Sequence, residues 1–311
     1  MVAPRVGPRA DSMRFCYNSR RKQIVRGLDK MKHWDTIAII GVGLIGGSIG
    51  LALRRGGLAS KIIGIGRRTS SLRAAKKCEA VDATTTNIQR GVRDADLVVV
   101  CTPVGQIIEH VQQAAESCPD ECLITDAGST KSRIVAALET SLPKNSTFVG
   151  SHPMTGSEKT GPLSAREDLF DNRLVIVTPT RRTKQKSIEE VEVFWQSLGA
   201  DVRRMLPKAH DGAIAIVSHL PHLVASALAG ATPEQLLPLA ATGWRDTTRV
   251  ASGDVELWRD ILGQNKDNVL ESLGVFEKWL ARFRKALESN DQTRVAKLLQ
   301  AGKQNRDAVG N

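Results

Sequence analysis

The chain lacks the features that define several large classes of protein. No apolar run approaches the roughly 18 residues of a membrane span, and the longest candidate, residues 37–53, is broken by five glycines. The five cysteines are scattered and form no CxxC pair, a pattern typical of reduced thiols in a cytoplasmic protein. There is no internal repeat. These absences leave a globular cytoplasmic protein with no membrane partner.

The basic excess is confined to the start of the chain. The net charge is +11, but residues 1–34 hold nine basic and two acidic residues, and the remainder is nearly balanced. This stretch has little apolar periodicity and predicts a disordered tail. It lacks the apolar core of a secretory signal. A start site upstream of the true one is favoured, because Met31 leads directly into the first strand; an organelle-targeting peptide is the alternative. No nucleic-acid partner is expected, because the body carries little net charge.

A length of 311 residues allows two domains, and the pattern changes between the halves. Strands alternate with helices in residues 35–180, which predicts a doubly wound parallel sheet of the Rossmann type. The expected strands are 36–40, 61–66, 96–101, 122–126 and, as the last, 174–179. Residues 181–186 read as a linker or surface turn, and 181–311 as an all-helical domain for substrate and dimerisation.

A dinucleotide fingerprint follows the first strand. Gly41 permits the tight turn, Gly43 lets a pyrophosphate approach the backbone, and Gly46 lets the helix pack on the strand. Leu44 and Ile45 open that helix, whose free N–H groups would face the phosphates. The flanking strand and helix make this GxGxxG more specific than the motif alone.

The residues after the second strand bear on cofactor choice. An acid here would bind the ribose hydroxyls of NAD, but the sequence has Arg67 and Arg68 followed by two hydroxyls. Guanidinium groups suit a 2′-phosphate, so NADP is favoured over NAD; an exposed basic turn is the alternative.

Polar residues follow the later strands. Thr102-Pro103, Ser129 and His152 are all expected just past carboxyl ends of strands, where ligands of such sheets gather. The sequence therefore predicts one crevice lined by these side chains. Ser129 is also a candidate helix cap for residues up to 138.

The second half contains a pair of arginines and a helix that is apolar enough to be buried. Residues 187–198 are amphipathic, and 209–230 form a long apolar helix, interrupted at Pro221, which suggests a homodimer interface. His219 and His222 have metal-like spacing, but no cysteine or acid accompanies them, so no metal is expected. Arg245 and Arg249 would share one helix face and could bind carboxylates, or form a solvated surface.

Several blocks together resemble the prephenate/arogenate (cyclohexadienyl) dehydrogenase family over residues 36 to about 285. They are Gly43-Leu-Ile-Gly-Gly-Ser48, Asp126-Ala-Gly-Ser129, Ser151-His-Pro-Met-Thr-Gly-Ser-Glu158, Ser218-His-Leu-Pro-His222, Arg245-Asp-Thr-Thr-Arg249 and Trp258-Arg-Asp-Ile261. The His-Pro-Met and Arg-Asp-x-Thr-Arg blocks are specific, whereas the fingerprint is generic. The missing acid after the second strand departs from the commoner NAD pattern of the family.

The resemblance implies NAD(P)-dependent oxidative decarboxylation of prephenate to 4-hydroxyphenylpyruvate, in tyrosine biosynthesis, or of arogenate to tyrosine. It implies that His152 takes the proton of the substrate hydroxyl and that Ser129 holds the same oxygen. Five further residues would contact the substrate or order its entrance: Arg249, Arg245, His222, Glu158 and Ser157. A β-hydroxyacid dehydrogenase, which would use a lysine of the helical half, and a non-catalytic NADP-binding module are the rival hypotheses.

Overall fold

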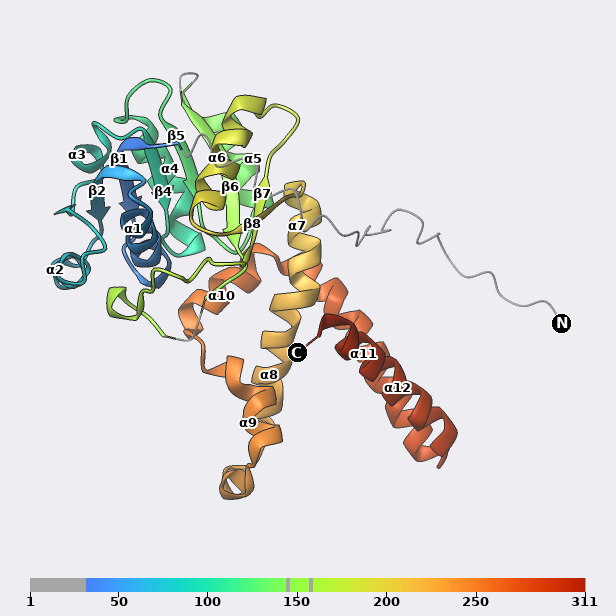
Figure 1. Ribbon diagram of the computed structural model, residues 1–311. Helices are drawn as coiled ribbons and strands as arrows, with labels where there is room; N and C mark the ends of the chain where they lie inside the picture. The colour runs from blue at the N-terminus through green and yellow to red at the C-terminus, as the bar shows by residue number, and fades with distance from the viewer. Residues whose placement is uncertain (1–31, 144–145, 157–158, 311) are drawn as a thin grey trace. The chain divides into compact units, whose positions relative to one another are not determined.

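The computed structural model describes residues 32–143, 146–156 and 159–310, and an eight-stranded sheet organises them (Figure 1). The strands lie in the order β3-β2-β1-β4-β5-β6-β7-β8. Their bounds are β1 Trp34–Ile40, β2 Ala59–Ile65, β3 Ala83–Thr85, β4 Leu97–Val100, β5 Leu123–Asp126, β6 Thr147–Pro153, β7 Leu174–Thr178 and β8 Asp201–Arg204. All neighbours pair in parallel except β6 and β7. The predicted Rossmann-type sheet is confirmed.

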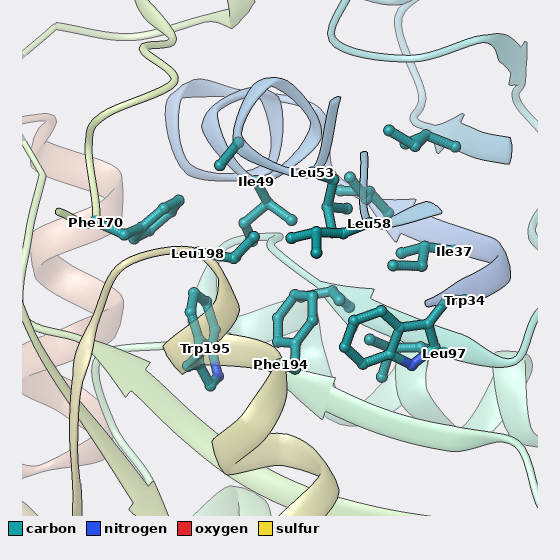
Figure 2. Packing of buried hydrophobic residues seen from close by; sticks show 14 of the residues in the cluster. Trp34, Ile37, Ile49, Leu53, Leu58, Leu97, Phe170, Phe194, Trp195 and Leu198 are labelled. Atoms are coloured by element: carbon teal, nitrogen blue, oxygen red, sulfur yellow. The ribbon is translucent and has the colours of Figure 1, made fainter. Parts of the chain in front are cut away.

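Helices cover both faces of the sheet, so its central strands are apolar on both sides. Ile37 and Ile39 of β1 face one core cluster, while Ala38 and Ile40 face the other. The helices on the first face are α1 Leu44–Gly56, α2 Thr69–Lys77 and α6 Gln185–Ser197; those on the second are α3 Ile88–Val92, α4 Ile107–Ala115 and α5 Ser132–Ser141. Figure 2 shows the first cluster, where Phe194 of α6 lies between Trp195 and Trp34.

The sheet continues further along the chain than the sequence suggested. The prediction that residues 174–179 form the last strand was wrong, because β8 pairs in parallel with β7. Three of the four residues of β8 (Asp201, Arg203, Arg204) are charged and exposed, so an edge strand of this composition has no apolar signature. The short β3 and the antiparallel direction of β7 were also missed.

Helices make up the described residues after β8. They are α7 Pro207–Ile214, α8 Leu220–Gly230, α9 Thr242–Thr248, α10 Val255–Gln264, α11 Lys266–Glu288 and α12 Gln292–Val309. Short helical turns accompany them: η3 Val104–Gln106 and η4 Pro162–Ser164 in the sheet half, then η5 Ala215–His219, η6 Glu234–Leu239 and η7 Arg249–Ser252. Helix α10 returns to the sheet, where Ile261 joins the second core cluster with Val104 and Ile107.

The long apolar helix is not interrupted at Pro221. A π-helical turn, η5, joins α7 to α8 directly before Pro221, so the distortion that a proline causes inside a helix is taken up locally and the backbone stays helical on both sides. By length and composition Pro207–Gly230 could also cross a membrane, a test that core helices of soluble proteins pass too. Within one chain much of it is uncovered, and Ile216 and Val217 are 60% and 65% exposed.

Candidate active site

Strand β6 carries His152 at the carboxyl edge of the sheet. The residue was expected just past the strand, but it is the last but one residue of β6 and pairs with Ile176 of β7. Only 8% of it is exposed. Pairing with β7 holds the imidazole more rigidly than a loop would.

His152 begins a chain of hydrogen bonds that crosses into the helical half. Its Nδ1 lies 2.9 Å from Nε2 of His210, and Nδ1 of His210 lies 2.8 Å from a carboxylate oxygen of Asp211. A carboxylate only accepts hydrogen bonds, so His210 carries its proton on Nδ1 and accepts at Nε2. His152 must then donate through Nδ1, which leaves the Nε2 lone pair of His152 free to take a proton.

The pKa values of the three hydrogen-bonded residues agree with these protonation states. Burial lowers the pKa of His152 well below that of free imidazole, and His210, Lys131 and His219 lower it further. Burial also lowers the pKa of His210, against the opposing effect of Asp211. Burial opposes ionisation of Asp211, but the hydrogen bond from His210 and those from the backbone of Ser132 and Lys131 outweigh it, and its pKa is lowered. Before reaction, His152 and His210 are therefore neutral imidazoles and Asp211 is an ionised carboxylate.

Asp211 also joins the two halves of the protein by capping α5. Its carboxylate accepts hydrogen bonds from the backbone N–H groups of Lys131 and Ser132, each at 2.8 Å. A negative charge at a helix N-terminus is favourable. Ser129, the predicted cap, does not fill this role. It lies half-buried in the loop between β5 and α5, next to Thr130, whose hydroxyl bonds Gln264 of α10 at 2.7 Å.

A buried ion pair lies behind this loop. Lys131 and Asp126 are both fully buried, and the lysine ammonium contacts the carboxylate. Asp126 also accepts hydrogen bonds from the backbone of Gly128 and Ser151. A side chain at Gly150 would meet the stem of Lys131 at 3.4 Å, so the stem passes beneath β6 two residues before His152. Lys131 therefore places a positive charge close to the predicted base.

Two further histidines sit on one helix face beside Trp258. The ring of His222 stacks on Trp258 at 3.6 Å between centroids, and His219 meets the same indole edge-on at 6.2 Å. Both histidines are at least nine-tenths buried. Asn265 supports His219: its side-chain amide nitrogen hydrogen-bonds Nδ1 of His219 and the carbonyl of Asp211. The structure thus connects His222 to the same buried cluster as His152.

The predicted arginines occupy neighbouring turns. Arg245 lies in α9 and Arg249 opens η7, and both side chains are exposed. The segment packs along α8, and Gly253 at its end lies against His222 and Trp258. Ser157 and Glu158 lie outside the described residues.

The glycines of the fingerprint have the geometry that a dinucleotide requires. Gly41 has a positive φ of 95°, and a side chain there would overlap the carbonyl of Cys101. A Cβ at Gly46 would come within 2.2 Å of the Gly41 oxygen, so helix and strand could not pack. The Cβ position at Gly43 faces open space, and the helix that carries Leu44 and Ile45 begins there. These residues fit a bound pyrophosphate.

The second strand, β2, ends at Ile65, one residue before the predicted end. Arg67 and Arg68 are exposed between β2 and α2, with Arg68 at the N-cap. Thr102 lies two residues past the end of β4, before Pro103, and its hydroxyl lies 3.0 Å from Nδ1 of His110. Burial lowers the pKa of His110, and Arg67 adds to this through its charge. His110 thus contacts Thr102 directly and lies within electrostatic range of Arg67.

The sequence did not identify the residues that orient the predicted site residues without being expected to contact the substrate. The sequence assigned no role to five residues that the structure places in this cluster: His210, Asp211, Lys131, Asn265 and Trp258. The adjacent His-Asp pair in the first turns of a predicted helix was the available signal. His210 is 58 residues from its partner His152, and Asp211 is 80 residues from its partner Lys131. Spacing along the sequence therefore could not identify these partners.

A phosphate-binding turn on a parallel sheet, next to an oriented and neutral imidazole, defines a nicotinamide-dependent dehydrogenase. Residues 49–204 match the model of the prephenate dehydrogenase nucleotide-binding domain, and residues 206–301 match the prephenate dehydrogenase dimerization domain. The chain therefore belongs to the prephenate dehydrogenase family, as its sequence blocks suggested.

Curated relatives and solved structures agree with this. Prephenate dehydrogenase of Bacillus subtilis is 37% identical over 289 residues, 91% of this chain and 77% of that protein. Cyclohexadienyl dehydrogenase of Zymomonas mobilis is 33% identical over 82% of this chain and 89% of its own length. The prephenate dehydrogenase of A. aeolicus, solved with hydroxyphenyl propionate and NAD+, has a TM-score of 0.82 and 32% identity, covering 88% of this chain and 98% of that one.

Proposed function

We propose that the protein catalyses the NAD(P)-dependent oxidative decarboxylation of prephenate to 4-hydroxyphenylpyruvate. Membership of the family supports the reaction. The observation that carries it is the hydrogen-bonded chain from His152 through His210 to Asp211. This chain leaves Nε2 of His152 unprotonated in a buried site, which is what removal of a hydroxyl proton needs.

In this mechanism His152 takes the proton of the ring hydroxyl at Nε2. A bound nicotinamide would supply the acceptor for the hydride that leaves the hydroxyl-bearing ring carbon. Loss of the ring carboxylate as carbon dioxide would make the ring aromatic, and the proton held on His152 would return to the ring oxygen. The imidazolium formed on His152 is stabilised through His210 by the carboxylate of Asp211. Aromatisation supplies most of the driving force, so the protein mainly needs a base and accurate positioning.

The substrate is held, in this proposal, from the helical half. Arg249 and Arg245 would bind carboxylate oxygens, since guanidinium groups bind them in bidentate fashion. His222, stacked on Trp258, would line the pocket, and Ser129 would hold the reacting oxygen. Ser157 and Glu158 remain proposed contacts at the entrance.

For the cofactor we propose NADP in preference to NAD. Arg67 and Arg68 flank the start of α2, where Thr69 and Ser70 add hydroxyls, and no acid occupies the end of β2. Two guanidinium groups and a helix N-terminus together suit a 2′-phosphate.

We also propose a homodimer formed through the helices after β8. Residues 206–301 match a dimerization domain, and several apolar side chains of α7–α8 and α11 are exposed within one chain. Examples are Ile216, Val217, Leu270 and Val275, all more than half exposed. The functional boundary would then lie after Arg204, where the sheet ends, rather than after residue 180. The four described cysteines are free, which supports a cytoplasmic location.

Arogenate, which has an amino group in place of the side-chain keto group, is the second candidate substrate. One experiment decides between them: the absorbance of reduced cofactor is followed with prephenate and arogenate, each with NAD and NADP. We expect the highest kcat/KM with prephenate and NADP. Turnover of neither substrate by folded protein would refute the proposed function, and turnover of small β-hydroxyacids instead would favour the rival class.

A further inference from the structure

Two buried ring nitrogens in the helical half have no hydrogen-bond partner. Among the described residues, Nε2 of His219 and Nδ1 of His222 are the buried side-chain atoms in this state. Both belong to the helix turn that packs against Trp258. Buried polar groups are paired in the great majority of cases, so an unpaired one points to a ligand.

The network around His219 fixes which of its nitrogens carries the proton. The side-chain amide of Asn265 donates to the carbonyl of Asp211 at 2.8 Å, and its oxygen accepts from Asn268 at 2.7 Å. The orientation of this amide is therefore settled. The same amide nitrogen lies 3.1 Å from Nδ1 of His219 and can only donate to it. Nδ1 is thus an acceptor, and Nε2 of His219 bears the hydrogen.

The ring is neutral as well as buried. Only 1% of His219 is exposed, and burial lowers its pKa to about 4. Nε2 is therefore an uncharged N–H donor directed into the protein without an acceptor. It sits at the end of a π-helical turn, a local distortion that is frequent at functional sites.

The surroundings of His219 belong to the predicted substrate pocket. Its ring meets Trp258 edge-on, and His222 stacks on the same indole. Asn265 links His219 to the carbonyl of Asp211, next to His210, which is hydrogen-bonded to His152. A charge on His219 would lower the pKa of His152. The partner that this donor lacks is an acceptor oxygen, such as a carboxylate or carbonyl oxygen.

We propose that Nε2–H of His219 donates a hydrogen bond to an acceptor oxygen of the bound substrate and so helps to determine which substrate is bound. This rests on the proposed function for the identity of the substrate. A neutral donor fits a pocket that already holds a buried lysine behind His152, since it recognises an oxygen without adding a further positive charge beside the base.

Two substitutions separate this role from a structural one. His219→Gln places an amide nitrogen near the Nε2 position and keeps the donor, whereas His219→Asn keeps only a group near Nδ1 that can accept from Asn265. We expect kcat/KM for substrate to fall about 10- to 100-fold in His219→Asn, the usual loss for a buried hydrogen bond, and to stay within about 3-fold in His219→Gln. The Michaelis constant for cofactor should not change in either variant.

Other outcomes overturn the proposal. Equal activity of both variants, or a loss confined to His219→Gln, would mean that His219 serves only its contact with Asn265. A change confined to the cofactor constant would mean that the acceptor belongs to the cofactor. If wild type turns over neither prephenate nor arogenate, the proposed function fails first, independently of His219.

A second measurement uses wild-type protein alone and tests the proposal even if the variants do not fold. In wild-type protein with ¹⁵N-labelled histidine, the Nε2–H resonance of His219 should move downfield when 4-hydroxyphenylpyruvate is added to the cofactor complex. A resonance that stays in place at saturating product would refute the hydrogen bond.

Discussion

Replacing Asp211 by asparagine tests the hydrogen-bonded chain behind the proposed base. The carboxylate accepts three hydrogen bonds, from His210 and from the backbone of Lys131 and Ser132. An asparagine has one oxygen, so its NH₂ group must face a backbone N–H whichever way the amide turns. In one orientation it also faces Nδ1 of His210 and favours the wrong tautomer of that ring.

The size of the effect follows from the charge that is lost. His152 becomes positive during the reaction, and a hydrogen bond to a charged group contributes about 1.5–3 kcal/mol, which corresponds to a fall in kcat of about 10- to 150-fold. The Michaelis constants should change little, because Asp211 is 2% exposed and is not expected to touch substrate. The unsatisfied N–H should cost about 1–3 kcal/mol of the free energy of unfolding.

The assay is the initial rate of cofactor reduction at saturating substrate, with a thermal melt of each variant. Asp94→Asn, a change of the same type at an exposed position, is the matched control and should leave both unchanged. A folded Asp211→Asn enzyme with wild-type kcat would show that His152 does not depend on this chain.

Four further predictions follow from the site. His152→Asn should retain cofactor binding, measured by fluorescence titration, but lower kcat about 10²- to 10⁴-fold; an unchanged rate would remove it from the mechanism. Arg249→Ala should mainly raise the Michaelis constant for substrate, and an effect on cofactor alone would contradict its placement. Gly46→Ala should abolish cofactor binding or folding, because the new Cβ would lie 2.2 Å from the Gly41 oxygen; a variant that binds cofactor normally would refute the packing argument. The free energy of unfolding should fall as pH drops from 6.5 towards the folded-state pKa of about 4 for His219, because the unfolded protein binds more protons in this range. Denaturant titrations should show that the free energy of unfolding changes by up to about 1.4 kcal/mol per pH unit for each buried histidine. A free energy of unfolding that does not change with pH would contradict the burial of these histidines as neutral rings.

Local patterns were enough to predict much of this protein. The strand before Gly41 and the helix after it follow from apolar spacing and from the backbone freedom of glycine, which act within a few residues. Residues in short, contiguous blocks, such as His152 with its neighbours, could be recognised for the same reason. The edge strand β8 was not predicted, because its exposed charged residues give no alternation of apolar and polar positions.

The tertiary structure decided how the base is held. His210 and Asp211 come from the helical half, and only folding brings them to His152 and to the N-terminus of α5. The tautomer of each imidazole depends on its partner, and the partner depends on contacts between distant segments. The sequence by itself therefore determined that a histidine lies at the edge of a nucleotide-binding sheet, whereas the three-dimensional packing determined which of its nitrogens is free to accept a proton.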